Sequence, residues 1–157
     1  MLPFGYIAAA RLEPAGQRFQ GDIFAAAPLL QPTPEGGAFA ASHPAILLTP
    51  TCDFALKSGG DVRQLCAIEV FTSDSPLRAQ FARNVVPQHV VPLPPLDPLL
   101  PHGGAVQLRR ASPVHASRVD ALTRITTLNE AGLRALLAGH ARYYLRTSID
   151  GAQIKVS

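Results

Sequence analysis

Residues 42–53 read Ser-His-Pro-Ala-Ile-Leu-Leu-Thr-Pro-Thr-Cys-Asp. Within them, the apolar run at 45–48 is flanked on both sides by proline. A short run that is apolar throughout is typical of a strand buried on both faces, or of a strand in a small barrel. The run leads directly to Cys52 and Asp53, so we expect this strand to deliver polar side chains to its own end.

The neighbouring sequence predicts further strands. Residues 19–30 contain a Gly-Asp-Ile-Phe turn that opens a strand, and residues 31–41 predict a Pro/Gly loop. A Gly-Gly turn at 59–60 makes the next strand, at 65–71, an antiparallel neighbour of the apolar run. Later strands are expected at 90–93, 105–111 and 122–128; the first of these contains proline and should lie at a sheet edge.

The C-terminal part of the chain predicts a helix over residues 128–146. Thr127 and Glu130 have the spacing of a capping box, and Asn129 is a competing cap. Apolar side chains then recur at helical spacing, among them Leu136. Glycines within this stretch each weaken a helix by about 1 kcal/mol relative to alanine. We therefore expect the helix to depend on packing against the strands.

Composition indicates one globular domain covering residues 1–157. The chain is 47% hydrophobic and 16% charged, and it has fifteen prolines, which favour short strands and long loops. A Pro-rich insertion is expected at 74–104. The chain has no apolar run of the ~20 residues that span a bilayer, and residues 1–12 do not resemble a signal peptide. Two cysteines make no disulfide framework, so a cytoplasmic protein without membrane contact is predicted.

The positive charge is concentrated in the second part of the chain. Residues 1–100 carry six Lys/Arg against eight Asp/Glu, whereas residues 101–157 carry eight against three. Arginine binds phosphates and carboxylates equally well, so this segment could contact a nucleic acid, an acidic protein partner, or solvent alone. The candidate contact residues are Gln107, Arg109, Arg110, His115 and Arg118.

Cys52 and Asp53 form a possible secondary site. A nucleophilic cysteine needs a histidine within hydrogen-bond reach, and His43 and His115 are the candidates. The alternative is structural: a small buried residue at a strand end, followed by a turn cap. The cysteines and histidines do not have the close spacing of a metal site, so neither a metal nor another cofactor is predicted.

The order of these elements resembles the MazF/PemK family of toxin endoribonucleases. The resemblance covers residues 19–73 and 104–146, through the Gly-Asp-Ile strand, the Pro-Ala-Ile-Leu-Leu-Thr strand, a third strand ending in Thr72-Ser73, a Val-Gln-Leu-Arg strand and the final helix. It implies a mainly β fold, an SH3-like small barrel with a C-terminal helix. It also implies a homodimer that cleaves single-stranded RNA without a metal.

The resemblance assigns roles to individual residues. His43 occupies the position where the family has a phosphate-stabilising arginine, and Thr72 or Ser73 occupies that of the second catalytic group. Gln107 and Arg109 match a glutamine followed by a basic residue. A neutral imidazole does not supply the fixed charge of a guanidinium, although histidine can act as a general acid or base.

Two hypotheses follow. In the first, the barrel is a binding module for nucleic acid or a larger protein, and serves as an accessory component of a phage, mobile-element or defence system. In the second, it is a metal-independent, toxin-like endoribonuclease. The departure at His43 favours the first. The expected partners are RNA or a larger protein, including an antitoxin-like protein.

Overall fold

The computed structural model describes residues 4–7, 12–13, 16–51 and 61–156. Within these residues, six strands form a single antiparallel sheet with the order β4-β5-β3-β2-β1-β6. The strands are β1 (Asp22–Pro32), β2 (Ala38–Leu47), β3 (Val62–Val70), β4 (Val90–Leu93), β5 (Gly104–His115) and β6 (Arg124–Thr127). The helices are α1 (Pro76–Ala82), α2 (Ala116–Asp120) and α3 (Glu130–Val156).

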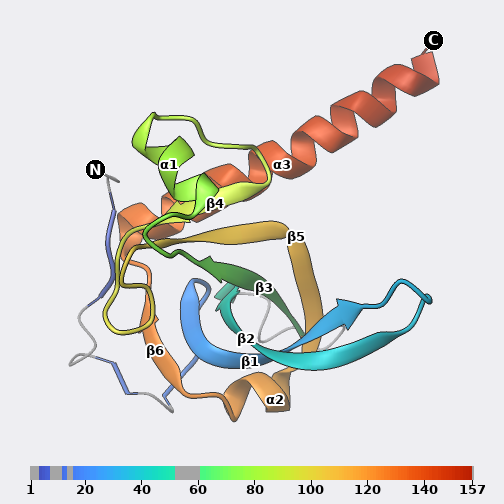
Figure 1. The fold of residues 1–157 in the computed structure, drawn as a ribbon. Coiled ribbons are helices and arrows are strands. Elements are labelled where there is room, and N and C mark those ends of the chain that lie inside the picture. Colours follow the sequence, from blue (N-terminus) through green and yellow to red (C-terminus); the bar gives the residue numbers. More distant parts are fainter. Residues whose placement is uncertain (1–3, 8–11, 14–15, 52–60, 157) are drawn as a thin grey trace.

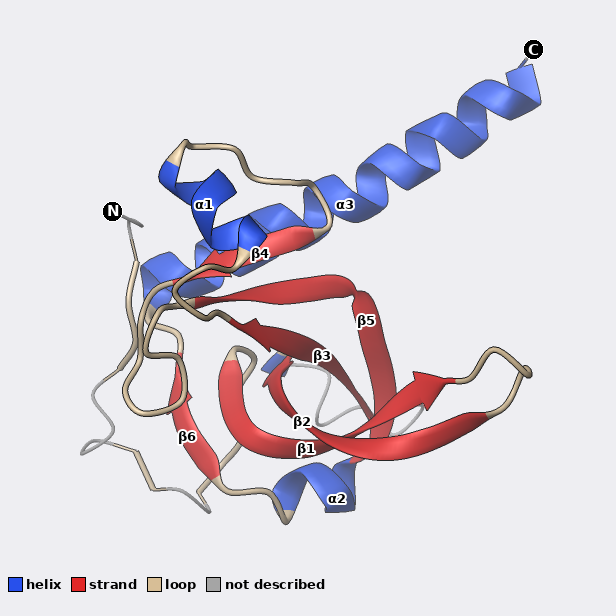
Figure 2. Ribbon diagram, in the orientation of Figure 1, coloured by secondary structure: helices blue, strands red, loops and turns tan. Residues whose placement is uncertain are grey.

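The sheet curls into a small barrel-like body (Figure 1). β1 and β5 are not ladder partners, but they meet where the Leu30 amide donates to Ser112 Oγ at 3.2 Å. Figure 2 shows α1 and α3 on one side of the strands and α2 on the other. The predicted fold class, mainly β with a C-terminal helix and a small barrel, is confirmed.

β2 is buried on both faces at residues 45–47, as the apolar run at 45–48 predicts, and β3 is buried on both faces at residues 65–68. Successive side chains of a strand point to opposite faces. Ile46 packs into one hydrophobic cluster, whereas its neighbours Ala45 and Leu47 pack into the other. Ala45 lies opposite Ala67, which confirms the predicted antiparallel pairing of β2 with β3. These two strands are therefore the centre of the protein.

The loop predicted at 31–41 is shorter in the structure, where it covers residues 33–37. β1 continues to Pro32 and β2 begins at Ala38, so the two strands form a long hairpin. We call its projecting end, residues 30–40, the arm (Figure 1). Gly36 takes a positive φ of 87° in its turn. Proline is tolerated in β1 because the β6 ladder ends at Phe24, leaving the rest of β1 with one ladder partner.

Residues 74–104, the predicted insertion, contain α1 and β4. β4 pairs only with β5, so the prediction that 90–93 form an edge strand is confirmed. The rings of Phe71 and Phe81 lie 5.5 Å apart and hold α1 beside this edge. The segment therefore extends the sheet on the side that faces α3.

The predicted capping box at Thr127 is wrong, because Thr127 pairs with Asp22 in the sheet. Asn129 is the cap: its Oδ1 accepts the Gly132 amide at 2.9 Å. α3 then runs from Glu130 to Val156, whereas the sequence predicted a helix over 128–146. A Cβ on Gly139 would lie 2.5 Å from Val91 Cγ2, so this glycine lets the helix lie close against β4.

A buried ion pair links the ends of β1 and β6. Arg124 Nη1 lies 3.1 Å from Asp22 Oδ2, and the two side chains are 3% and 0% exposed. The same carboxylate oxygen accepts the Phe19 amide at 2.9 Å. Arg124 Nη2 also donates to the Glu13 carbonyl at 2.7 Å. Arg124 thus attaches the segment before β1 to the sheet.

In the described part of the chain, no helix combines the length and the apolar composition needed to cross a bilayer.

Candidate active site

A cavity of about 510 Å³ opens between β2, β3 and β5. We call it the His43 cavity, and it is lined by His43, Pro44, Ile68, Glu69, Val70, Gln107 and Arg110. Three of these residues are candidates from the sequence, and they come from strands that are distant in the chain. The fourth polar residue of the lining, Glu69, was not a candidate.

The pairing of β2 with β3 brings His43 to Glu69. Ala45 lies opposite Ala67 in an antiparallel ladder. Continuing this register by two residues places His43 level with Glu69, and both side chains line the cavity. Both residues are half-buried. The imidazole and the carboxylate thus lie just beyond the Ala45–Ala67 pair of the two central strands.

A wide bulge in β5 delivers the other two polar side chains. Val106 lies opposite Ile68 and Ala111 lies opposite Cys66, so residues 107–110 together face the single residue Ala67. Such an insertion bends a strand and interrupts its ladder. β5 bends sharply along its length (Figure 1). Gln107 and Arg110 lie in this bulge, which we call the β5 corner.

Cys66, in β3, stabilises the β5 corner through a hydrogen bond. Its thiol donates to the carbonyl of Gln107, with Sγ and O 2.8 Å apart. Burial raises the pKa of this thiol to about 12. The thiol therefore stays protonated at neutral pH and keeps its role as a donor. The next amide along the corner, that of Leu108, donates to the His89 carbonyl at 2.9 Å.

The hydrogen bonds of the His43 cavity constrain its chemistry. Gln107 Nε2 donates to Glu69 Oε2 at 2.7 Å, which fixes the carboxylate. His43 Nδ1 lies 2.9 Å from the carbonyl oxygen of Pro44. A carbonyl only accepts, so Nδ1 carries the proton, and in the neutral ring Nε2 keeps its lone pair. Nε2 is therefore the nitrogen that can exchange a proton with a ligand.

Together these side chains suit chemistry on an anion. Imidazole and carboxylate are the usual general acids and bases of enzymes. The exposed guanidinium of Arg110 presents a planar fork that matches a phosphate. Among the residues that the structure describes, no group of three or more His, Cys, Asp or Glu side chains is placed to hold a metal ion.

Thr72 and Ser73 do not line the His43 cavity. They lie in the turn that leads into α1, where both are exposed. Thr72 Oγ1 donates to Asp74 Oδ1 at 2.8 Å, and its amide donates to Ser75 Oγ at 2.8 Å. The carbonyl of Ser73 accepts from Arg78 at 2.8 Å. In this structure, both residues take part in the hydrogen bonds of a turn.

The basic segment after the corner is divided among several places. Arg109 lines a second cavity with Arg110. His115 is the N-cap of α2, and its Nδ1 accepts the Ser117 amide at 3.2 Å. Arg118 lines a groove of about 340 Å³ among alanines of β1 and β2. Cys52 and Asp53, the predicted secondary site, lie outside the described residues.

Glu69 is the site residue that sequence reasoning missed. The signal is a single acidic residue in the otherwise apolar stretch 65–71, whose pattern predicts a strand and no more. A charged side chain in a central strand needs a polar partner or an opening to solvent. Glu69 has both, in Gln107 and the His43 cavity.

No family model matches the chain, and no curated protein matches its sequence. Among solved structures, the chain is similar to MazF (Form-I) from Deinococcus radiodurans, with 15% identity and a TM-score of 0.45, covering 79% of this chain and 93% of that one. It is also similar to MazE-MazF (Form-II) from the same organism, with 15% identity and a TM-score of 0.44, covering 79% and 92%.

Proposed function

We propose that the protein binds single-stranded RNA at the His43 cavity and cleaves it as a metal-independent endoribonuclease. The observation that supports this proposal is that His43, Glu69 and Arg110 line one open cavity. Cleavage of RNA without a metal needs a base, an acid and a cation for the phosphate. These three side chains supply the three functions.

In the proposed reaction, the 2′-hydroxyl of the RNA attacks the adjacent phosphorus atom. The Glu69 carboxylate accepts the proton of this hydroxyl, and protonated His43 donates from Nε2 to the departing 5′-oxygen. Arg110 contacts the non-bridging phosphate oxygens, where negative charge accumulates in the transition state. The products are a 2′,3′-cyclic phosphate and a free 5′-hydroxyl. Gln107 keeps Glu69 in place through the 2.7 Å hydrogen bond.

The distribution of charge supports RNA as the ligand. Both cationic side chains of the β5 corner, Arg109 and Arg110, are exposed. They belong to residues 101–157, a part of the chain that contains eight Lys/Arg and three Asp/Glu. Phosphate contacts from arginine supply most of the non-specific affinity for nucleic acids.

A second candidate function is a binding module without catalysis, acting as an accessory component of a phage, mobile-element or defence system. The position of Thr72 and Ser73 favours it, because these two predicted catalytic residues lie in the turn before α1 and outside the cavity lining. In this case Arg110 would still bind RNA or an acidic protein, and no strand cleavage would follow.

The proposal includes a homodimer and an antitoxin-like protein partner in the cytoplasm. Exposed apolar side chains on α3 support a protein contact: Leu137 is 42% exposed, Tyr144 48% and Leu145 59%. Light scattering after gel filtration would measure the mass of the free protein. A monomer at all concentrations would contradict the homodimer.

The decisive experiment incubates the purified protein with a mixed RNA pool in EDTA. We expect cleavage with 2′,3′-cyclic ends, and a loss of about 10²–10⁴-fold in His43→Ala and Glu69→Gln. Arg134→Ala is the matched control, because this exposed arginine lies on α3 and pairs with Glu130. Salt-dependent RNA binding without cleavage would favour the binding module, and the absence of both would contradict the two RNA-based functions.

A further inference from the structure

A second cavity, of about 550 Å³, adjoins the His43 cavity. We call it the arm cavity, because it lies between the arm and β5, and it is lined by Leu30, Gln31, Pro32, Ala38, Arg109, Arg110, Ala111, Ser112 and Pro113. Arg110 lines both cavities. Arg110 is therefore the residue that borders both cavities, and a ligand that contacts it in the His43 cavity lies next to the arm cavity.

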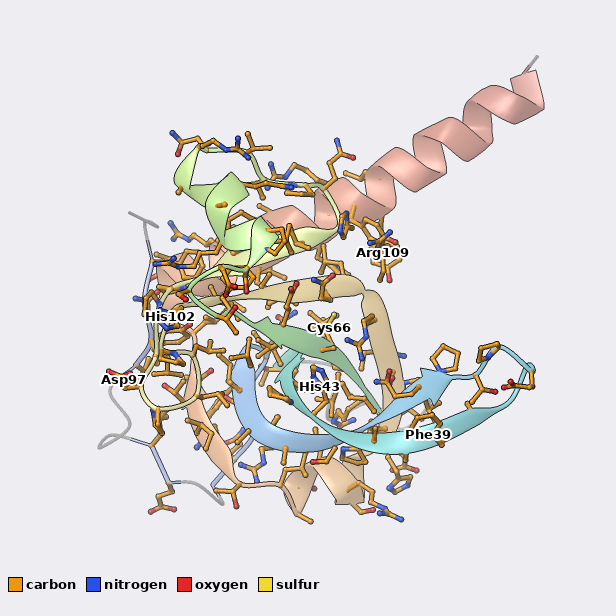
Figure 3. All side chains as sticks on the ribbon, viewed as in Figure 1. Phe39, His43, Cys66, Asp97, His102 and Arg109 are labelled. Atoms are coloured by element: carbon orange, nitrogen blue, oxygen red, sulfur yellow. The ribbon has the colours of Figure 1, made fainter. Side chains whose placement is uncertain are left out.

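The β5 corner explains why two arginines face the same space. Consecutive side chains of a regular strand point to opposite faces, so Arg109 and Arg110 would normally diverge. Residues 107–110 have no regular ladder to β3, and both arginines line the arm cavity. Figure 3 shows Arg109 beside the bend of β5. The bulge thus produces a paired cationic site at the junction of the two cavities.

The opposite wall of the arm cavity is mostly apolar and belongs to the arm. Leu30 lines it and is 50% exposed. Pro32 and Ala38 continue this wall, and Gln31 is its polar member. Two guanidiniums on one wall and apolar side chains on the other match a nucleotide, which has a charged phosphate and a base that packs on apolar surface.

We propose that the arm cavity binds a third nucleotide, beyond the two that flank the cleaved phosphodiester, with the phosphate that joins this nucleotide to the chain held by Arg109 and its base against the arm. This inference rests on the proposed function, since it takes RNA as the ligand of the His43 cavity. It identifies the preferred substrate as an RNA longer than a dinucleotide. Arg109 acts as a specificity residue for chain length.

The test measures binding of fluorescent oligonucleotides whose 2′-O-methyl riboses prevent cleavage. The wild-type protein is expected to bind a hexamer at least tenfold more tightly than a dinucleotide. In Arg109→Ala, the affinity for the hexamer should approach that for the dinucleotide. The slope of log affinity against log salt should also fall by about 0.7, the value for one lost phosphate contact on a single strand. Arg134→Ala, which removes an equal charge on α3, should keep the length dependence.

The outcomes separate this inference from the proposed function. If Arg109→Ala keeps both the length dependence and the salt slope while RNA is still cleaved, the arm cavity is not a nucleotide site and the proposed function stands. If the wild type neither binds nor cleaves RNA of any length, both fail. Binding of polyglutamate in preference to the hexamer, lost in Arg109→Ala, would assign the cavity to an acidic protein and overturn the inference.

Discussion

The side-chain amide of Gln107 donates to the carboxylate of Glu69 over 2.7 Å, from the β5 corner to the end of β3. Gln107 lies in the bulge that interrupts the ladder between β5 and β3, and Glu69 lies in β3. The bond therefore links the two strands across the bulge. It also holds Glu69, the one acidic side chain among the described residues that line the His43 cavity. Several expectations follow from this bond and from the packing around it.

Replacing Gln107 by leucine should slow RNA cleavage by about 10- to 150-fold, because a hydrogen bond to a charged group is worth roughly 1.5–3 kcal/mol. Gln107 acts by positioning Glu69, so kcat should fall while KM for a dinucleotide changes little. Steady-state kinetics measure this split, and thermal melting controls for folding. A rise in KM at constant kcat would instead make Gln107 a substrate-binding residue.

Leu136→Ala should lower the free energy of unfolding by about 2–5 kcal/mol, the usual cost of truncating a buried leucine. Leu136 is 1% exposed and packs against the sheet, whereas its neighbour Leu137 is 42% exposed. Leu137→Ala is thus a matched control that should change stability by about 0.5 kcal/mol or less. Urea denaturation compares the two variants, and equal losses would contradict the placement of α3.

Arg124→Met should destabilise the protein by roughly 3–5 kcal/mol, since it leaves the buried carboxylate of Asp22 without its cation. Adding Asp22→Asn removes that charge and should recover part of the loss. A double-mutant cycle by urea denaturation measures the coupling. Additive effects of the two substitutions would show that the ion pair contributes nothing of its own.

Stability should fall as the pH drops below about 6.5, the ordinary pKa of histidine. Burial lowers the pKa of His140, and burial together with Arg109 lowers the pKa of His89. The unfolded chain then binds protons that the folded chain does not, so unfolding is favoured as pH falls toward the lowered values. The dependence should weaken in His140→Gln, as measured by urea denaturation at several pH values.

The sequence allowed the centre of the fold to be predicted. The run at 45–48 has apolar side chains for both faces, and burial on both faces is what the two hydrophobic clusters show. The arm was missed because the prolines and glycines within residues 31–41, at 32, 34, 36 and 37, suggest a loop. Proline disrupts a strand only where its missing amide is needed, and β1 has a second ladder partner only as far as Phe24.

The candidate site was predicted only in part. His43, Gln107 and Arg110 were identified from residue type and order, and they line one cavity. Glu69 was missed because its role depends on its partner Gln107, and the two are 38 positions apart. The joint placement of Arg109 and Arg110 depends on the β5 corner, a shift of register between strands that no local pattern encodes.

The β5 corner also separates the residues that can contact a ligand from the strand register that places side chains in the core. Each half of β5 keeps its own register with β3, one ending at Val106 and the other beginning at Ala111. Except for the buried Leu108, the residues between these points can be exchanged without altering which side chains enter the core. The protein can thus acquire a new ligand preference at the corner while its interior stays as it is.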